Sequence, residues 1–177
     1  MNYSIIVPLY NEEKNVKLLN KELVQSIIEL KKTKERAFEL IFVDDGSQDN
    51  TFNELKSLNN KNEFPTVIVK HRKNLSQSAA LLTGIGKSKY ENFIFLDGDL
   101  QNDPKDLGVI IDKFETGYDM VVGWRKKRKD SFFTKTLPSL MANSLVRLFT
   151  TSKIHDHGCA LKVLKKAGVV DAGAQGF

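Results

Sequence analysis

The feature that most restricts the fold of this sequence is a unit that occurs four times along the chain. Each unit is a short apolar run, then a polar cluster, then a segment whose apolar residues have helical spacing; the runs lie at 3–8, 40–43, 67–69 and 92–96. Strands that alternate with helices form a mostly parallel sheet with helices on both faces. The sequence therefore predicts a three-layer α/β/α fold with a mostly parallel central sheet.

Start and stop signals support the predicted helices. Asp49 and Asn50 precede the second helix as capping candidates. Asp103-Pro104 supplies an N-cap and a first-turn proline for the fourth helix, which should end near Gly117. A further short apolar run follows. We predict helices over 16–30, 51–58, 77–86 and 104–117, and a fifth strand over 120–122.

Polar residues follow each of the first four predicted strands. They are Asn11-Glu12, Asp44-Asp45, Lys73-Asn74 and the segment 97–99. The carboxyl ends of parallel strands share one edge of a sheet, and ligands bind beyond that edge. We therefore expect these clusters, which lie far apart in the sequence, to converge in space and to form a binding site.

The length and charge of the chain limit its organisation and its partners. With 177 residues, 41% of them hydrophobic, we predict one domain over 1–166 and an anomalous or truncated tail over 167–177. Lys and Arg number 27 against 22 Asp and Glu, and the net charge of +5 favours polyanionic partners such as nucleotides, phosphates or an anionic membrane surface. Nucleic acid is not expected, because aromatic residues are not interleaved with the basic ones.

Neither a secretion signal nor a membrane span is predicted. The first residues hold a short apolar run without a basic leader, and no stretch reaches the roughly 18 uninterrupted apolar residues that a spanning helix needs. The single cysteine, Cys159, excludes an internal disulfide and fits a reducing compartment. We therefore expect a cytoplasmic protein that is soluble or peripheral on a membrane.

Asp97 and Asp99 are the strongest candidates for metal ligands. They follow an apolar strand directly, with Gly98 between them. Two hard oxygen donors in this position can share a Mg²⁺ or Mn²⁺ ion with a diphosphate, and the ion would neutralise charge on a departing diphosphate. The alternative, that these aspartates only cap the next helix, is weaker because Asp103 already fills that role.

Asp44, Asp45 and Glu12 are candidates for nucleotide binding, but their residue types also suit ordinary turns. Carboxylates after a strand can accept hydrogen bonds from a nucleobase N–H or from ribose hydroxyls. The Asp, Gly and Ser of 44–47 also favour turns without any ligand, and Glu12 can simply favour the positive end of the following helix. Both interpretations stay open on these residues alone.

A basic segment and an amphipathic one follow the fifth predicted strand. Residues 125–129 are RKKRK, five consecutive cations. The lysines are typical of a solvated surface, whereas the planar guanidinium groups of Arg125 and Arg128 can bind phosphate in a bidentate manner. The segment 132–150 predicts either a helix that lies on a membrane or an ordinary helix packed on the core.

Residues 155–159, HDHGC, hold several metal-binding residue types in a short stretch. We reject a zinc site here, because no second cluster supplies a ligand pair at a recognised spacing. A Cys–His nucleophile pair likewise has no partner motif elsewhere in the sequence. Asp156 remains a candidate as a carboxylate close to the flexible Gly158.

Five segments of the chain occur in an order that is specific to one family. They are VPLYNEE at 7–13, VDDGSQDNT at 43–51, 74–84, LDGDLQNDP at 96–104 and 123–130. Together they resemble the inverting family-two glycosyltransferases of GT-A fold, a Rossmann-like fold of nucleotide-diphospho-sugar transferases. Within this family, the resemblance is to the branch of dolichol-phosphate mannosyltransferase and bacterial undecaprenyl-phosphate glucosyltransferases.

The resemblance implies roles for individual residues. The residues expected at the nucleotide sugar are Pro8, Tyr10, Glu12, Asp44, Asp45, Asp97 and Gly98. Those expected around the Mg²⁺ or Mn²⁺ ion are Asp97, Asp99 and Gln101, and those expected at the acceptor phosphate are Arg125, Arg128 and Ser131. Asp99 and Asp156 would be catalytic, Asp156 as a positioning group or weak base, and 132–150 would be an interfacial helix.

The implied reaction moves a hexose from a UDP- or GDP-hexose to a dolichyl or undecaprenyl phosphate at the cytoplasmic face of a membrane. A phosphomonoester has a second pKa of about 6, so the acceptor is largely dianionic at neutral pH and needs little help from a general base. Displacement at the anomeric carbon would invert its configuration. The alternatives are a glycosyltransferase with a soluble glycan or polysaccharide acceptor, and a truncated, inactive nucleotide-sugar-binding domain.

Overall fold

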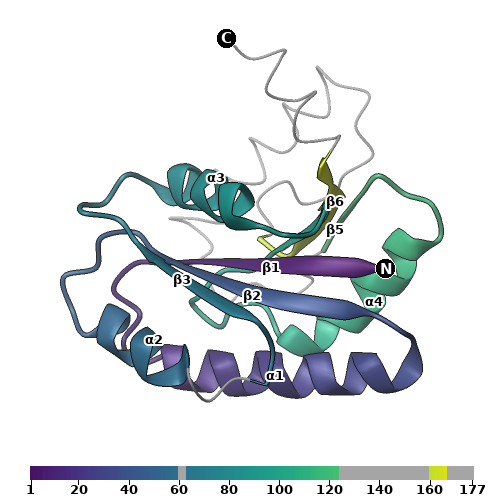
Figure 1. Cartoon of the computed structure of the whole chain (residues 1–177), viewed down its shortest axis with the longest axis horizontal. Coiled ribbons are helices and arrows are strands. Elements are labelled where there is room, and N and C mark those ends of the chain that lie inside the picture. The colour runs from purple at the N-terminus through teal and green to yellow at the C-terminus, as the bar shows by residue number, and fades with distance from the viewer. Residues whose placement is uncertain (60–62, 124–159, 167–177) are drawn as a thin grey trace, which may run out of the picture.

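The computed structural model describes residues 1–59, 63–123 and 160–166, which form a six-stranded sheet with helices on both faces (Figure 1). The strands are β1 (Asn2–Leu9), β2 (Ala37–Asp44), β3 (Thr66–Lys70), β4 (Asn92–Phe95), β5 (Met120–Val122) and β6 (Lys162–Lys165). The helices are α1 (Val16–Thr33), α2 (Thr51–Asn59), α3 (Gln77–Lys87) and α4 (Leu107–Glu115), with a short 3-10 turn η1 (Pro104–Asp106) before α4. This order confirms the predicted three-layer α/β fold.

The sheet is mostly parallel, as predicted. Its strand order is β3-β2-β1-β4-β6-β5, and β1 pairs in parallel with both β2 and β4. The register places Leu9 beside Asp44 and Asp44 beside Lys70, so the carboxyl ends of β1, β2 and β3 are level.

Strand β6 was not among the predicted strands. It runs antiparallel to both β4 and β5 and lies between them. Its four residues, KVLK, hold too short an apolar pattern to indicate a strand by themselves. The strand forms through pairing with partners that are distant in the sequence, and this pairing has no local signature.

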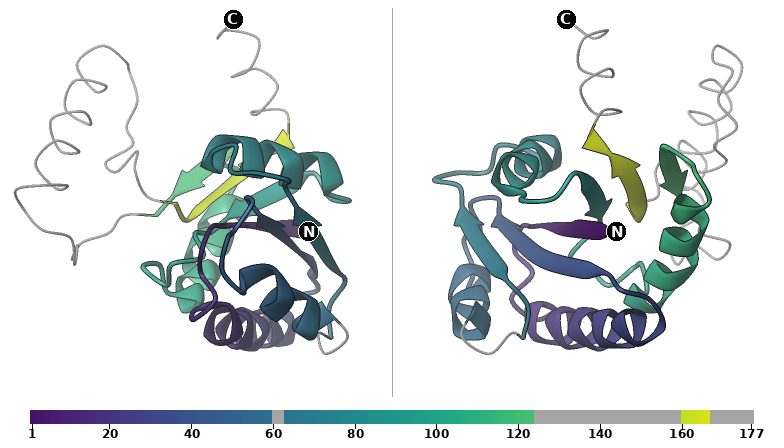
Figure 2. Two further views of the ribbon diagram at one scale, coloured as in Figure 1. Left: turned by 90° about the vertical axis from the view of Figure 1, so that its left-hand side faces the viewer. Right: turned by 45° about the vertical axis from the view of Figure 1, so that its right-hand side comes forward.

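The helices form two layers around the sheet. α3 packs on one face, over β1 and β2, whereas α1, α2 and α4 lie on the other (Figures 1 and 2). β1 is buried on both faces, with Ile5 and Val7 in the larger core and Ile6 in the smaller core under α3. A Cβ on Gly84 of α3 would lie 2.3 Å from the Ile6 side chain, so this glycine lets the helix approach the strand closely.

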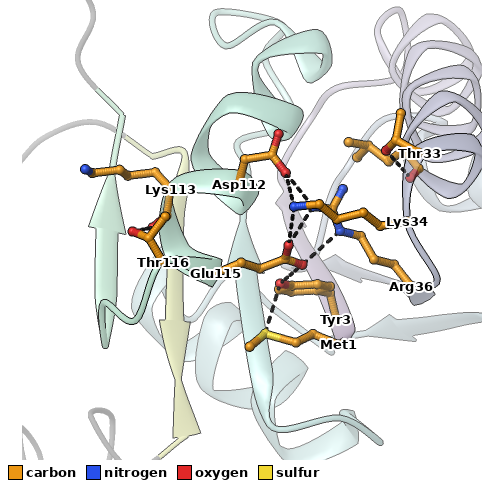
Figure 3. Close-up of polar contacts among 10 residues, drawn as sticks. Met1, Tyr3, Thr33, Lys34, Arg36, Asp112, Lys113, Glu115 and Thr116 are labelled. Atoms are coloured by element: carbon orange, nitrogen blue, oxygen red, sulfur yellow. Dashed lines mark hydrogen bonds and ion pairs between the residues drawn. The ribbon is translucent and has the colours of Figure 1, made fainter.

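A charged cluster, here called the amino-edge network, lies where β1 and β2 begin (Figure 3). Arg36 donates from Nε and Nη2 to the two carboxylate oxygens of Glu115 at the end of α4, both at 2.8 Å. The hydroxyl of Tyr3 donates to Glu115 at 3.0 Å. Lys34 contacts Asp112 and Glu115 at 3.1 and 3.0 Å, and Arg36 also donates to Asp112. The network ties α4 to the first two strands.

The amino-edge network has a buried centre and an exposed rim, where the side chains of Lys34 and Asp112 are more than half exposed. The Arg36 side chain is 1% exposed and that of Glu115 is 14% exposed. Hydrogen bonds from Arg36 outweigh the effect of burial and lower the pKa of Glu115 to about 2. Burial and the bond to Glu115 raise the pKa of Tyr3. The opposite charges in this network pair with one another, which is typical of a structural ion cluster. Nη1 of Arg36 is buried without a hydrogen-bond partner among the described residues.

Candidate functional site

A pocket of about 340 Å³, here called the carboxyl-edge pocket, lies where β1, β2 and β4 end. It brings together eight of the sequence-predicted residues, namely Pro8, Tyr10, Glu12, Asp45, Asn74, Asp97, Gly98 and Asp99. The other lining residues are Leu9, Ser76 and Gln77. Four of these side chains are acidic, and none of the described lining residues is Lys or Arg. Among the described lining residues, every formally charged side chain is therefore acidic.

Hydrogen bonds between two loops fix the Glu12 side of the pocket. The backbone N–H of Asn11 donates to Oγ of Ser47 at 2.9 Å, and that of Glu12 donates to Oγ1 of Thr51 at 2.8 Å. Asn11 adopts a left-handed conformation (φ 56°), which asparagine tolerates better than most residues. The Glu12 carboxylate accepts a bond from Nδ2 of Asn15 at 2.6 Å. The loops after β1 and β2 thus form one unit.

Asp44 and Asp45 occupy different environments although they are adjacent. Asp44, the last residue of β2, is fully buried and is not among the residues that line the pocket. Its Oδ1 accepts the backbone N–H of Ser47 at 3.0 Å, while Lys70 Nζ lies 3.8 Å from Oδ2. Oδ2 is buried without a hydrogen-bond partner in the described part of the chain. Such an orphaned acceptor costs about 1–3 kcal/mol, which a ligand N–H could recover.

Asp45 lines the pocket and also anchors the loop that follows β3. Its carboxylate accepts the backbone N–H groups of Leu75 and Ser76 at 3.0 and 2.9 Å, and lies 2.7 Å from Nδ1 of the buried His71. Burial alone would raise the pKa of Asp45, but the bonds from His71 and the two N–H groups outweigh it and lower the pKa. Nε2 of His71 lies 2.9 Å from Oγ1 of Thr83 in α3.

Two unusual backbone positions shape the loop between β3 and α3. Gly46 has φ 74°, and a Cβ there would lie 2.3 Å from the backbone carbon of Lys73, so a side chain would collide with that loop. Ser76 has φ 107° and ψ 155°, a conformation that is essentially restricted to glycine and costs about 1–3 kcal/mol. Strain of this size at a pocket-lining residue indicates that the surrounding contacts determine the shape of the loop.

The segment 97–99 contributes two carboxylates to the pocket. Asp97 accepts a hydrogen bond from Nε2 of Gln77, and Oδ1 of Asp99 accepts the backbone N–H of Gln101 at 3.0 Å. A Cβ on Gly98 would lie 2.9 Å from the Leu9 side chain, so glycine brings this segment close to the end of β1. Gln101 itself is exposed and is not among the lining residues.

The described residues can supply only part of a metal coordination shell. They contain no cluster of three or more His, Cys, Asp or Glu side chains placed to hold an ion. Mg²⁺ is commonly held by one or two carboxylates, with the remaining positions taken by substrate phosphates and water. Asp97 and Asp99 fit this kind of shared ion. The neighbouring Asp103 caps η1 by accepting the N–H of Lys105 at 2.9 Å, so the capping role predicted for it is confirmed.

Several predicted residues lie outside the described residues. These are Asp156, Arg125, Arg128 and Ser131, together with the segment 132–150. Conversely, sequence reasoning did not single out His71, Ser76 or Gln77 as site residues. Gln77 had one signal that could have identified it, because it is the first residue of a helix that begins near the ligand-binding edge of the sheet. In the described part of the chain, no helix has the length and apolar character needed to cross a membrane.

Comparisons with known proteins agree with the fold and with the family that the sequence resembles. The family model for "Glycosyl transferase family 2" matches residues 4–170. The chain is 37% identical over 166 residues to dodecaprenyl-phosphate galacturonate synthase of Rhizobium johnstonii, covering 93% of this chain and 48% of that protein. It is 33% identical to undecaprenyl-phosphate 4-deoxy-4-formamido-L-arabinose transferase of Proteus mirabilis, covering 97% of this chain and 51% of that protein. The chain thus spans about half the length of these curated relatives.

A solved structure supports the predicted GT-A fold. The mannosyltransferase PcManGT from Pyrobaculum calidifontis, in complex with GDP-Man and Mn²⁺, superimposes with a TM-score of 0.62. The match covers 97% of this chain and 46% of that one, with 18% identical residues. At this level of identity the likeness establishes the fold.

Proposed function

The chain belongs to glycosyl transferase family 2, and from that premise we propose that it transfers a hexose from a nucleoside diphosphate sugar to a polyprenyl phosphate. The donor is a UDP- or GDP-hexose, bound with Mg²⁺ or Mn²⁺. The acceptor is a dolichyl- or undecaprenyl-type lipid phosphate, met at the cytoplasmic face of a membrane.

The acceptor is inferred from the relatives. Both of the curated relatives described above are named for a polyprenyl phosphate, dodecaprenyl in one and undecaprenyl in the other. Their named sugars differ, so the relatives support the lipid phosphate more strongly than any one donor. The basic and amphipathic segments at 125–129 and 132–150 suit an anionic lipid surface.

The observation that carries the proposal is the convergence of Asp97 and Asp99 with Asp45 and Glu12 in one pocket at the carboxyl edge of the sheet. Four carboxylates in the pocket would repel a diphosphate, and no Lys or Arg among the described lining residues offsets this repulsion. A divalent cation between the diphosphate and the 97–99 segment removes this repulsion. When bound, such an ion also stabilises the negative charge of the departing diphosphate.

The chain's own residues would bind and orient the donor. Asp97 and Asp99 supply the oxygen ligands, and the Gln77 amide holds Asp97 in place. Pro8, Tyr10 and Asp45 line the same pocket and would contact the nucleoside. The buried, orphaned Oδ2 of Asp44 offers an acceptor for a nucleobase N–H beside this pocket.

The acceptor would need alignment more than activation. Its phosphate is already dianionic at neutral pH, so one of its oxygens can attack the anomeric carbon directly while the bond to the nucleoside diphosphate breaks. Arg125, Arg128 and Ser131 would hold that phosphate, and Asp156 would position it or act as a weak base. Asp156→Asn separates these roles, because turnover that persists in this variant excludes the base.

The test is the release of UDP or GDP from a panel of UDP- and GDP-hexoses in the presence of Mn²⁺ and a short-chain polyprenyl phosphate in detergent. The matched control is the same lipid as a free polyprenol, without phosphate. Release that requires both the ion and the lipid phosphate supports the proposal and identifies the donor. Arg125→Ala and Arg128→Ala should then raise the KM for the lipid phosphate.

Two other outcomes would replace the proposal. Equal release with a soluble glycan would identify a different acceptor class. Ion-dependent donor binding without release for any acceptor would identify a nucleotide-sugar-binding domain, an outcome consistent with a chain that spans half the length of its relatives. Flotation with liposomes that contain anionic lipids separately tests the membrane surface.

A further inference from the structure

Gln77, the first residue of α3, contacts the first aspartate of the segment 97–99. Its side-chain amide donates from Nε2 to Oδ1 of Asp97, and both residues line the carboxyl-edge pocket. Carboxylates that bind metal ions are themselves held by hydrogen bonds, and these outer partners set their orientation. The Gln77 amide is therefore in the place of such an outer partner for Asp97.

The place of Gln77 is set by Asp45, which comes from a different strand end. The two backbone N–H groups that precede Gln77, those of Leu75 and Ser76, donate to the Asp45 carboxylate. Ser76 has a backbone conformation that persists only where surrounding contacts over-determine it. Asp45 thus holds the turn from which the Gln77 side chain extends.

His71 in turn holds Asp45. Its ring is buried, with Nδ1 lying 2.7 Å from Asp45 and Nε2 lying 2.9 Å from Oγ1 of Thr83. The ring therefore ties the Asp45 carboxylate to the body of α3. The contacts form one continuous chain from Thr83 through His71 and Asp45 to the first residue of the same helix.

We propose that Gln77 is a positioning residue for Asp97 and that His71 sets the place of Gln77 through Asp45. The inference rests on the proposed function, in which Asp97 shares a divalent ion with the donor diphosphate. It links the nucleoside side of the pocket to the ion side through the first turn of α3. His71 acts at a distance, since it is not among the residues that line the pocket.

The first test measures the Mn²⁺ concentration that gives half-maximal binding of UDP or GDP, whichever binds more tightly. Loss of an outer hydrogen bond to a metal ligand typically weakens metal affinity about 10–100-fold, so Gln77→Ala should raise this concentration at least about 10-fold. The matched control is Ser78→Ala, the next residue of α3, which is exposed and outside the pocket lining. It should stay within about twofold of the wild type. Thermal unfolding should be unchanged in both variants.

The second test uses two substitutions of His71 that each keep one of its contacts. In His71→Asn, the side-chain amide can still donate to Asp45 but no longer reaches Thr83. In His71→Gln, the longer side chain reaches toward Thr83 and loses the Nδ1-like donor to Asp45. The proposal predicts that His71→Gln raises the Mn²⁺ requirement and that His71→Asn retains most of the wild-type affinity. A merely structural role for the ring predicts equal losses in both variants.

A ligand-free measurement separates this inference from the proposed function. In ¹⁵N-labelled protein, the Gln77 side-chain amide protons should shift toward the position of a free amide in Asp97→Ala, which removes the acceptor, and in His71→Gln, but not in His71→Asn. If the wild type binds no nucleoside diphosphate with Mn²⁺, the proposed function fails while this signal still tests the chain of contacts. A Gln77 signal that does not respond to His71→Gln, or a Gln77→Ala variant with the wild-type Mn²⁺ requirement, overturns the inference.

Discussion

The two ends of the central sheet both hold clusters of charged residues, but the clusters differ in how their charge is balanced. In the amino-edge network, Arg36 and Lys34 face Asp112 and Glu115 at hydrogen-bonding distance. In the carboxyl-edge pocket, four acidic side chains meet without a Lys or Arg among the described lining residues. Removing one partner from a buried ion pair is strongly destabilising, so we expect substitutions in the amino-edge network to lower stability. We expect substitutions in the carboxyl-edge pocket to act on ligand binding.

The largest expected effect comes from removing one charge at the pocket. Asp97→Asn should lower the rate of sugar transfer on the order of 10³-fold, because it removes a ligand from the ion that neutralises the diphosphate. The free energy of unfolding should not fall, since the substitution relieves repulsion among carboxylates. Rates of nucleoside diphosphate release and urea unfolding curves measure the two quantities.

The matched control for that variant is Asp119→Asn, an acid whose side chain is 81% exposed and which pairs with Lys165 on the surface. It should change neither quantity appreciably. A stability loss in Asp97→Asn with a normal transfer rate would contradict the distinction between a binding role for the carboxyl-edge pocket and a structural role for the amino-edge network.

The opposite pattern is expected at the amino edge. Arg36→Met leaves the carboxylate of Glu115 buried without its main partner and should lower the free energy of unfolding by about 4 kcal/mol. The affinity for the nucleoside diphosphate should remain that of the wild type, as measured on the folded protein. Adding Glu115→Gln to Arg36→Met removes the stranded charge and should recover part of the lost stability. If the single variant loses donor affinity while folded, the amino edge is coupled to the site.

The pH dependence of the free energy of unfolding should reveal the contribution of Glu115. Its pKa is lowered from 4.5 to about 2 in the folded protein, so its stabilising contribution is complete above pH 4.5 and disappears as the pH falls toward 2. A depression of this size corresponds to about 3 kcal/mol. The Glu115→Gln variant should therefore lose less stability than the wild type between pH 5 and pH 2 in urea titrations. Parallel curves for both proteins would contradict this assignment.

The smallest effect is expected at Ser76, where the pocket itself carries strain. Glycine adopts φ 107° without the steric cost that serine incurs, so Ser76→Gly should raise the free energy of unfolding by about 1 kcal/mol. Little capping energy is lost, because the Ser76 hydroxyl accepts from Ala79 only at 3.4 Å. A clear loss of stability in this variant would mean that the hydroxyl, and not the backbone, determines the loop.

The sequence predicts the elements of this fold better than the contacts between them. The run 3–8 indicates β1, observed at Asn2–Leu9, and the helix predicted at 77–86 is observed at Gln77–Lys87. These elements have local signatures in apolar spacing and capping residues. β6 has none, since a four-residue strand is defined by its pairing with β4 and β5.

The residues of the candidate site also differ in whether the sequence could predict them. Asp97 and Asp99 could be predicted because they follow a buried strand, and ligands of parallel sheets bind beyond the carboxyl ends of the strands. His71 and Gln77 could not, because their importance comes from contacts with Asp45 and Asp97 that depend on how α3 packs. Arg125, Arg128, Ser131 and Asp156 remain predictions from the resemblance.

The most direct test of this account is calorimetric titration of UDP and GDP into the protein with Mn²⁺ and, separately, with EDTA. We expect that one nucleotide binds in the presence of Mn²⁺ and that binding is largely lost in EDTA, because the four carboxylates of the described pocket repel a diphosphate unless a cation lies between them. Equal affinity in both conditions, or no binding of either nucleotide, would contradict it.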